Sequence, residues 1–315
     1  MKNLISRADF LKQTSALLFA AGFVPSSFGK LSAKEGAKML ERTIEKSGEK
    51  IPAIGLGTWQ TMDVSKDSLE LKSLQEVWKE FIDNGGSVVD SSPMYGRAEE
   101  IVGVLASELT EERRKKIFYA TKVWTRGESS GREQIQNSFQ KLKTDTIDLF
   151  QIHNLVDVET HLKFLRLLQE ENKIRYIGLT HYVSSAFQEM ERIAKYHKPE
   201  FIQIPYSIVT REAENRILPF AATNGISVLI NRPFEEGELF RKVKGKALPE
   251  YFKDWDCDSF GQAFLKFILS HPAVTCVIPA TSKVSHLRDN LKAGFGKLPA
   301  GKERDEFKRH LLEFF

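Results

Sequence analysis

Three short apolar, β-branched runs in this chain each end on a side chain that can carry a charge. These end residues are Asp90, Lys122 and His153, and a tyrosine, Tyr95, follows Asp90 by five residues in a polar segment. An acid and a phenol on one loop at a strand end can reach into one pocket, which is compatible with a metal site or a hydrolase. What such a pocket does depends on the side chains that the rest of the chain brings to it.

These runs belong to a regular alternation of short strands and amphipathic helices. The predicted strands cover residues 54–59, 87–90, 117–122, 147–152, 174–179, 201–204, 226–230 and 274–278, and the predicted helices cover 68–81, 98–105, 135–142, 162–168, 186–196, 212–222, 260–269 and 287–293. Apolar strands that alternate with helices predict a parallel sheet covered by helices. Eight repeats favour a closed (β/α)₈ TIM barrel over an open doubly wound sheet.

The start of the chain's regular part supports this α/β fold class. Gly55 and Gly57 lack the third glycine of a Gly-x-Gly-x-x-Gly fingerprint, which argues against the dinucleotide-binding doubly wound fold. Two short extended runs on either side of the turn pair Ser47-Gly48 predict a β-hairpin. We expect this hairpin to close the bottom of a barrel domain that spans residues 41–315. Catalytic side chains of such barrels lie at the C-terminal ends of the strands, so Asp90, Lys122 and His153 should meet there.

Composition excludes several classes of partner. The chain has 315 residues, of which 41% are hydrophobic and 28% charged, as in an ordinary soluble globular protein. Its net charge of +4 is accounted for by the first 50 residues, and the near-neutral remainder argues against nucleic acid or an anionic membrane as a partner. Cys257 and Cys276 are too few for a disulfide framework and lack metal-ligand spacing, so we expect buried thiols and no metal site.

Residues 41–295 resemble the aldo-keto reductase family. The matching segments are 55–59, 90–96 with Glu99, 121–122, His153, 178–180, Gln203 and 278–279, in the family's order. The resemblance places the family's catalytic tetrad on Asp90, Tyr95, Lys122 and His153. It implies an NAD(P)H-dependent oxidoreductase that reduces an aldehyde or ketone, its small-molecule partner, to an alcohol.

The chemistry of these four side chains agrees with that implication. A hydride must reach the carbonyl carbon, and since no side chain supplies a hydride, it must come from a nicotinamide. A proton must reach the carbonyl oxygen, and we expect Tyr95 to donate it, with Lys122 lowering the phenol's pKa from about 10. Asp90 would hold Lys122 in place. His153 would hydrogen-bond the substrate oxygen.

The resemblance also implies the cofactor-binding residues near the nicotinamide. Thr180, His181 and Gln203 match the Ser-Asn pair and the Gln that hold the carboxamide in the family. Asn231 stands where the family often stacks an aromatic ring, and Arg232 either contacts the pyrophosphate or is a surface charge. The predicted residues at this end of the cofactor are Gly57, Thr58, Thr180, His181, Gln203, Asn231 and Arg232.

A second group of residues concerns the choice between NADP and NAD. Thr281, Ser282 and Lys283 precede a predicted helix, where family members that prefer NADP hold its 2′-phosphate, and a helix N-terminus itself favours phosphate. Asp289 and Asn290 match the family's adenine-contacting pair. We therefore expect NADP as the cofactor, with NAD as the alternative.

Substrate specificity in this fold comes from loops, here residues 59–66, 124–130 and 234–257. Trp59 and Trp124 are the expected pocket walls, or else they pack against the barrel rim. One other function stays open at this stage, a catalytically weak cofactor-binding barrel that acts as a redox sensor or partner subunit. A phosphate-binding aldolase-type barrel would need a Schiff-base lysine. Lys122 could serve chemically, but its setting among Asp90, Tyr95 and His153 is wrong for that role.

Residues 1–28 are expected to be a signal-like segment, and residues 29–40 a linker. Lys2 and Arg7 precede an apolar stretch, 14–24, and small residues follow it, which is typical of a secretory signal. The segment also resembles a twin-arginine signal with Ala8 at the second arginine's position. The stretch is too short to span a membrane. We expect a periplasmic or exported protein that is loaded with its cofactor before translocation. The alternative is a cytoplasmic enzyme with an amphipathic N-terminal helix.

Overall fold

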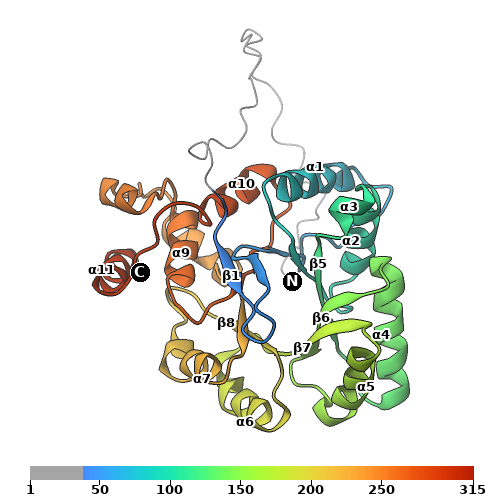
Figure 1. The fold of residues 1–315 in the computed structure, drawn as a ribbon. Helices are drawn as coiled ribbons and strands as arrows, with labels where there is room; N and C mark the ends of the chain where they lie inside the picture. The colour runs from blue at the N-terminus through green and yellow to red at the C-terminus, as the bar shows by residue number, and fades with distance from the viewer. Residues whose placement is uncertain (1–37) are drawn as a thin grey trace, which may run out of the picture. The chain divides into compact units, whose positions relative to one another are not determined.

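Eight parallel strands, paired in chain order, curl into the predicted barrel (Figure 1). Parallel bridges Ile54–Val277 and Gly57–Ala280 join the first strand to the last and close the sheet. This computed structural model describes residues 38–315, so the signal-like segment 1–28 and most of the linker 29–40 lie outside the described residues. The strands are β3 (Leu56–Gly57), β4 (Val88–Asp90), β5 (Phe118–Val123), β6 (Ile147–His153), β7 (Ile174–Thr180), β8 (Phe201–Pro205), β9 (Ser227–Asn231) and β10 (Cys276–Val277).

A ring of helices covers the outside of the barrel, as the periodicity predicts. Helix α1 shows why they form, since the Ser68 hydroxyl caps its first turn by accepting from Leu71 N at 3.3 Å, and its apolar face lies buried. No helix within residues 38–315 is both long and apolar enough to cross a membrane. The ring consists of α1 (Leu69–Asp83), α2 (Ala98–Ser107), α4 (Glu128–Leu142), α5 (Val158–Glu170), α6 (Phe187–His197), α7 (Ile217–Thr223), α9 (Phe260–Leu269) and α10 (Val284–Lys292).

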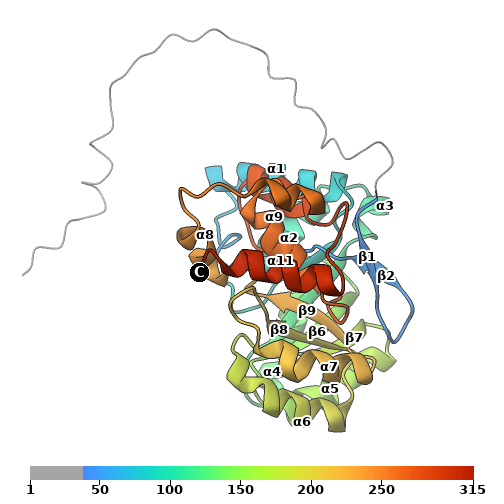
Figure 2. The ribbon, with the colours of Figure 1, turned by 90° about the vertical axis from the view of Figure 1, so that its left-hand side faces the viewer.

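Three helices were not predicted: α3 (Glu111–Arg114), α8 (Glu238–Lys242) and α11 (Lys302–Leu312). The last of these lies across α9 (Figure 2). It buries only Phe307 and Leu311 along its length, so its apolar stripe is too narrow for a clear periodic signal. Phe307 packs against the rings of Phe252 and Trp255, with centroid distances of 5.1 Å to each.

The N-terminal hairpin of β1 (Glu41–Thr43) and β2 (Lys50–Pro52) closes the bottom of the barrel, as predicted. Ile51 of β2 and Ile44, which directly follows β1, belong to the same buried cluster as the residues of the barrel interior, which is why this end is sealed. The Tyr176 hydroxyl of β7 reaches the hairpin turn and lies 2.7 Å from Ser47 Oγ and 2.8 Å from Glu49 Oε2.

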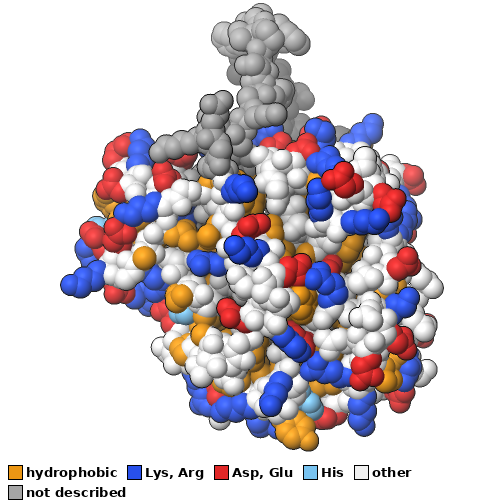
Figure 3. Space-filling model, in the orientation of Figure 1, with side chains coloured by type: hydrophobic (Ala, Val, Ile, Leu, Met, Phe, Trp, Pro, Cys, Tyr) orange, Lys and Arg blue, Asp and Glu red, His pale blue; other side chains and the backbone are white. Residues whose placement is uncertain are grey.

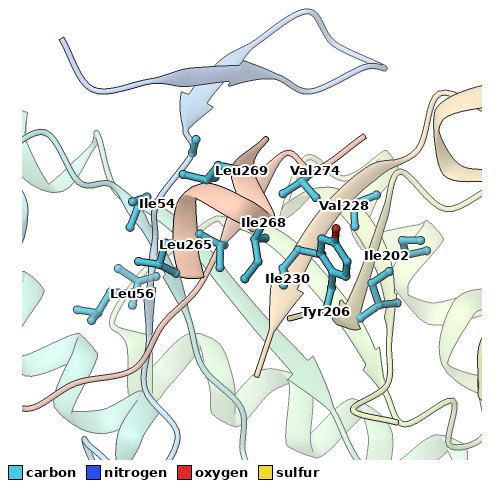
Figure 4. Close-up of a cluster of buried hydrophobic side chains, with 14 of the residues drawn as sticks. Ile54, Leu56, Ile202, Tyr206, Val228, Ile230, Leu265, Ile268, Leu269 and Val274 are labelled. Carbon is cyan, nitrogen blue, oxygen red and sulfur yellow. The ribbon is translucent and has the colours of Figure 1, made fainter. Parts of the chain in front are cut away.

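The outward faces of the strands form a second apolar layer with the helices. Helix α9 is buried at all ten of its positions, because the barrel lies on one side and α11 on the other. Figure 4 shows this packing around Ile54, Leu56, Ile202, Tyr206, Val228, Ile230, Leu265, Ile268, Leu269 and Val274. Cys257 and Cys276 are buried free thiols, as predicted.

Alternation along each strand carries one set of side chains into the barrel and the other set outward. On β6, Leu149 belongs to the interior cluster, while Phe150 and Ile152 belong to the outer one. Gln151 and His153 share the phase of Leu149, so the interior changes from apolar at the bottom to polar at the top. On the molecular face in Figure 3, basic and acidic side chains are interspersed.

Candidate active site

Asp90 and Lys122 form a buried ion pair inside the barrel mouth. Lys122 Nζ donates to Asp90 Oδ2 at 2.6 Å and to the carbonyl of Ser91 at 2.7 Å. Burial lowers the pKa of Lys122, but the charge of Asp90 and the hydrogen bonds to Asp90 and Tyr95 outweigh it, so the pKa is raised from its ordinary value. Lys122 is therefore an ammonium at neutral pH.

The other oxygen of Asp90 is also fully used. Gln151 Nε2 lies 3.0 Å and Gln203 Nε2 lies 2.8 Å from Asp90 Oδ1. The exposed fraction of the Asp90 side chain is 3% and that of Lys122 is 0%. A pair this dry is stable only when additional hydrogen bonds satisfy both charges, and the two glutamines and the Ser91 carbonyl provide them.

Tyr95 lies beside this ion pair on the loop after β4. Lys122 Nζ is 4.9 Å from the centre of its ring, and the ring of His153 stands perpendicular to it at 5.9 Å. The loop is held by Asp63, whose Oδ1 accepts from Arg97 N at 2.9 Å. At Gly96, where φ is +62°, a Cβ atom would clash with the Asp63 carboxylate, so glycine allows this approach.

The expected direction of the Tyr95 pKa was wrong. Burial raises the pKa of the phenol above its ordinary 10, and the ammonium of Lys122 opposes this shift without reversing it. Burial prevails because a phenolate loses its hydration in a dry site. At neutral pH Tyr95 therefore keeps its proton, as a proton donor requires.

His153 is neutral in this site. Burial, together with the charges of Lys122 and His181, lowers its pKa to about 2. Its Nδ1 lies 3.1 Å from Ser92 Oγ, and the ring of Trp124 lies 6.4 Å from the His153 ring. A neutral imidazole next to Tyr95 can orient a carbonyl oxygen by donating a hydrogen bond, and it carries no charge at neutral pH.

A cavity of about 720 Å³ opens at the C-terminal ends of the strands. Asp90, Tyr95 and His153 reach it together with the predicted walls Trp59 and Trp124. Its size and apolar walls suit a cofactor head and a small substrate. The other residues that line it are Gly57, Thr58, Gln60, Thr61, Met94, Asn154, Thr180, Tyr182, Gln203, Asn231, Arg232, Pro233, Phe234, Glu236, Gly237, Phe240, Ile278 and Ala280.

One end of the cavity carries the residues expected to hold a nicotinamide. Gln203 Oε1 accepts from Thr180 Oγ1 at 3.2 Å and from Asn231 Nδ2 at 3.4 Å. Asn231 Oδ1 is buried without a hydrogen-bond partner. A buried acceptor beside this amide and hydroxyl fits a ligand with an amide N–H, such as a nicotinamide carboxamide.

The structure does not bring His181 to the cavity wall. Its Nδ1 accepts from the backbone N–H groups of Tyr182 at 3.0 Å and Val183 at 3.2 Å. The ring stacks on that of Tyr182, with centroids 5.4 Å apart, and Tyr182 lines the cavity instead. The period of the strand does not distinguish His181 from Tyr182, because both follow the last residue of β7, Thr180.

The residues expected at the phosphate groups of the cofactor are only partly at the cavity. Arg232 lines it and pairs with Glu235 at 3.6 Å and Glu236 at 3.4 Å. Ser282 and Lys283 are exposed before α10, and Thr281 Oγ1 accepts from Lys283 N at 3.1 Å. This short turn presents two polar side chains at the helix N-terminus.

The pair expected at the adenine lies on α10. Asn290 is buried, and both carboxylate oxygens of Asp289 face the start of α9. Asp289 accepts from Ser259 Oγ and from Gln262 Nε2, each at 2.7 Å. In this structure Asp289 therefore links the two helices.

Two polar residues near the tetrad were missed by the sequence analysis, Ser92 and Gln151. Each lies within a segment that was recognised, but neither stands at a strand end. Gln151 could have been recognised as a polar residue in an otherwise apolar strand. It precedes His153 by two positions, so the period of the strand directs both side chains into the barrel.

Comparison with known proteins gives the family. The family model described as "Aldo/keto reductase family" matches residues 53–302. The chain is 31% identical over 229 residues to aldo-keto reductase YhdN of Bacillus subtilis, covering 68% of this chain and 66% of that protein. It is 25% identical over 260 residues to methylglyoxal reductase YeaE of Escherichia coli, covering 80% and 89%.

Solved structures agree with the fold. An aldo/keto reductase from Klebsiella pneumoniae in complex with NADP and acetate superposes with a TM-score of 0.72 at 23% identity, covering 86% of this chain and 95% of that one. The thermostable aldo-keto reductase Tm1743, in complex with the inhibitor epalrestat, superposes with a TM-score of 0.72 at 26% identity, covering 88% and 100%. The family-model match over residues 53–302, together with the barrel and the tetrad geometry, shows that the chain belongs to the aldo/keto reductase family.

Proposed function

We propose that this protein is an NADP-dependent oxidoreductase that reduces an aldehyde or a ketone to the alcohol, with Tyr95 as the proton donor. The observation that carries the proposal is a protonated phenol and a neutral imidazole at one cavity, with a buried ammonium behind the phenol. Tyr95 and His153 line the cavity with their rings 5.9 Å apart, and Lys122 Nζ lies 4.9 Å from the Tyr95 ring. A hydrolase needs an activated nucleophile, and this arrangement activates a proton donor instead.

Each tetrad side chain has a distinct task in this reaction. His153 donates a hydrogen bond to the carbonyl oxygen and so orients it for attack. Tyr95 gives its proton to that oxygen, and the ammonium of Lys122 stabilises the phenolate left behind. Asp90 holds Lys122 at 2.6 Å through one carboxylate oxygen, and two glutamine amides occupy the other. Asp90 therefore supports the proton donor and is not itself the catalyst.

The cofactor fits the residues at the nicotinamide end. Thr180, Gln203 and Asn231 would hold the carboxamide, with the unpartnered Asn231 Oδ1 as an acceptor. Arg232 would face the pyrophosphate, and Ser282 and Lys283 the 2′-phosphate. NADPH supplies the hydride when it is bound. Relatives of the same fold have been solved with NADP or NADPH.

The redox-sensor hypothesis is less well supported than the enzyme. A barrel that only senses its cofactor has no need of a proton donor, yet all four tetrad residues are present and connected. An aldolase is disfavoured because Lys122 is an ammonium paired with Asp90, whereas a Schiff-base lysine must be a free amine.

A turnover assay separates these functions. The purified full chain is mixed with NADPH and a panel of aldehydes and ketones, and the near-ultraviolet absorbance of the reduced nicotinamide is followed. Methylglyoxal comes first in the panel, because two of the similar proteins are named methylglyoxal reductases. We expect carbonyl-dependent oxidation of NADPH. Tight NADPH binding without turnover of any carbonyl would favour the sensor.

We further propose that residues 1–28 direct export of the folded, cofactor-loaded protein. The charged start, the apolar stretch 14–24 and the small residues after it support this proposal. Fractionation of cells that express the tagged full chain tests it. Recovery from the cytosol alone, with residues 1–28 uncleaved, would contradict export.

A further inference from the structure

Gln151 lies inside the barrel, two positions before His153 on β6, and its side chain is fully buried. Its register partners are Lys122 on β5 and Gly178 on β7. A Cβ atom at Gly178 would lie 2.9 Å from Gln151 Cγ. The glycine therefore leaves the space that this long polar side chain needs in the interior.

The amide of Gln151 is directed at Asp90. Its Nε2 donates to Asp90 Oδ1 at 3.0 Å, and its Oε1 accepts from Gln203 Nε2 at 3.2 Å. Both ends of the amide are thus used in a site without solvent, where an unmet polar group is costly. Such an arrangement fixes the rotation of the Asp90 carboxylate.

Gln203, the second donor to the same oxygen, has a competing task. Its Nε2 is shared between Asp90 Oδ1 at 2.8 Å and Gln151 Oε1, and its Oε1 accepts from Thr180 and Asn231. All of its hydrogen bonds are committed within the protein. A cofactor carboxamide that binds Gln203 must therefore take one of them, and Gln151 is then the remaining amide on Asp90.

We propose that Gln151 is a positioning residue of the reductase: its amide fixes Asp90 Oδ1 so that Oδ2 stays on Lys122 Nζ, including when Gln203 turns to the cofactor. This inference rests on the proposed function, because it assigns a task in the same reaction. Gln151 touches neither substrate nor cofactor and acts through Asp90 and Lys122.

Two substitutions separate this task from simple packing. Gln151→Leu keeps most of the volume and removes the donor. Gln151→Glu keeps the shape, and its carboxyl can donate to Asp90 only while it is protonated. Two carboxyl groups about 3 Å apart share a proton, because both cannot be charged in a dry site. The titratable groups next to this position are Asp90, to which Gln151 donates, and Lys122, its register partner on β5, and Lys122 is already paired with Asp90.

The kinetic test compares pH profiles of kcat and KM. We expect Q151L to lower kcat about tenfold at every pH with little change in KM, the size of effect seen when an oriented group loses a hydrogen bond. We expect Q151E to approach the wild type at acidic pH and to lose activity as the pH rises.

Leu149→Val, at the preceding inward position of β6, is the matched control, because it loosens the interior without touching Asp90. A Q151E profile parallel to that of the wild type, or a Q151L kcat equal to that of L149V, would overturn the proposal.

A second measurement needs no turnover. The free energy of unfolding of the cofactor-free protein is measured in urea at several pH values for the wild type and Q151E. The shared proton raises the folded-state pKa of the new carboxyl above the unfolded value of about 4.3. The protonated carboxyl, which stabilises the folded state, is therefore present at low pH and is lost as the pH rises. The loss of unfolding free energy in Q151E relative to the wild type should consequently grow with pH. If the loss of unfolding free energy in Q151E is the same at every pH, the proposed role of the Gln151–Asp90 contact is overturned. If that loss grows with pH but the wild-type protein reduces no carbonyl, only the proposed function is overturned.

Discussion

The hydroxyl of Ser92 lies 3.1 Å from Nδ1 of His153. Ser92 Oγ also accepts from Met94 N at 3.3 Å, so its own hydrogen is free to point at the imidazole. Nδ1 then accepts, and the single proton of the neutral ring is on Nε2. The serine thereby sets which nitrogen of His153 can donate to a substrate oxygen.

Replacing Ser92 by Ala should therefore impair orientation of the substrate and leave the cofactor site intact. We expect kcat/KM to fall about tenfold, because the tautomer of His153 is no longer fixed, and the Kd for NADPH to stay unchanged. Steady-state kinetics and fluorescence titration measure the two. Ser91→Ala is the control, since Ser91 Oγ bonds Thr58 and not His153. Equal losses in both variants would refute the tautomer argument.

Tyr95→Phe removes the proton donor and retains the ring. General-acid catalysis contributes roughly 10²–10⁴-fold to such reactions, so kcat should fall by at least about a hundredfold. The Kd for NADPH should change little, because the ring keeps its contacts with Lys122 and His153. Retention of most of the activity would mean that another group, or water, supplies the proton.

The pH dependence of reduction should be flat around neutrality. His153, with a pKa of about 2, stays neutral there and adds no inflection. Tyr95 must be protonated to donate, and its pKa is raised above 10, so activity is present below that value and is lost only as the pH rises through it. The measurement is kcat/KM against pH with a carbonyl substrate. An inflection near pH 6.5 would show a titrating histidine and contradict the neutral His153.

The buried pair of Asp90 and Lys122 predicts a double-mutant result. Asp90→Asn or Lys122→Met alone leaves one buried charge without its partner, which costs about 3–5 kcal/mol of unfolding free energy. The double variant removes both charges and should recover a large part of that loss, while remaining inactive. Urea unfolding of the four proteins measures this coupling. Additive losses would mean that the two charges do not depend on each other.

Lys283 offers a test of the expected NADP site. Its exposed position before α10 suits a 2′-phosphate, so Lys283→Ala should weaken NADPH binding about tenfold, as loss of one charge-assisted contact does. Binding of NADH, which lacks that phosphate, should not change. Lys292→Ala, in the last turn of the same helix, is the control. Parallel changes for both cofactors would exclude a phosphate contact at Lys283.

The strand–helix alternation and the residues at the predicted strand ends could be read from the local sequence. Because the C-terminal ends of the barrel strands meet at one mouth, these end residues predicted that Asp90, Lys122 and His153 lie together. Ser92 and Gln151 gave no such signal, because their tasks depend on which atoms they meet from other strands. The net direction of the Tyr95 pKa shift could not be predicted from the sequence either, because burial and the charge of Asp90 raise the pKa while Lys122 lowers it.

The closing of the barrel has a consequence for how the chain folds. Its first and last strands meet through Gly55 N to Val277 O at 2.8 Å and Gly57 N to Pro279 O at 3.1 Å, contacts between opposite ends of the described chain. Closing so long a loop costs conformational entropy, and the chain loses this entropy before the bonds between the two strands can form. Such topologies are therefore slow to fold. A nascent chain can complete the cavity only after Ala280, which pairs with Gly57 and lines the cavity, has been synthesised. Until then Asp90 and Lys122 face an open sheet and water, so the dry ion pair is among the last features to form.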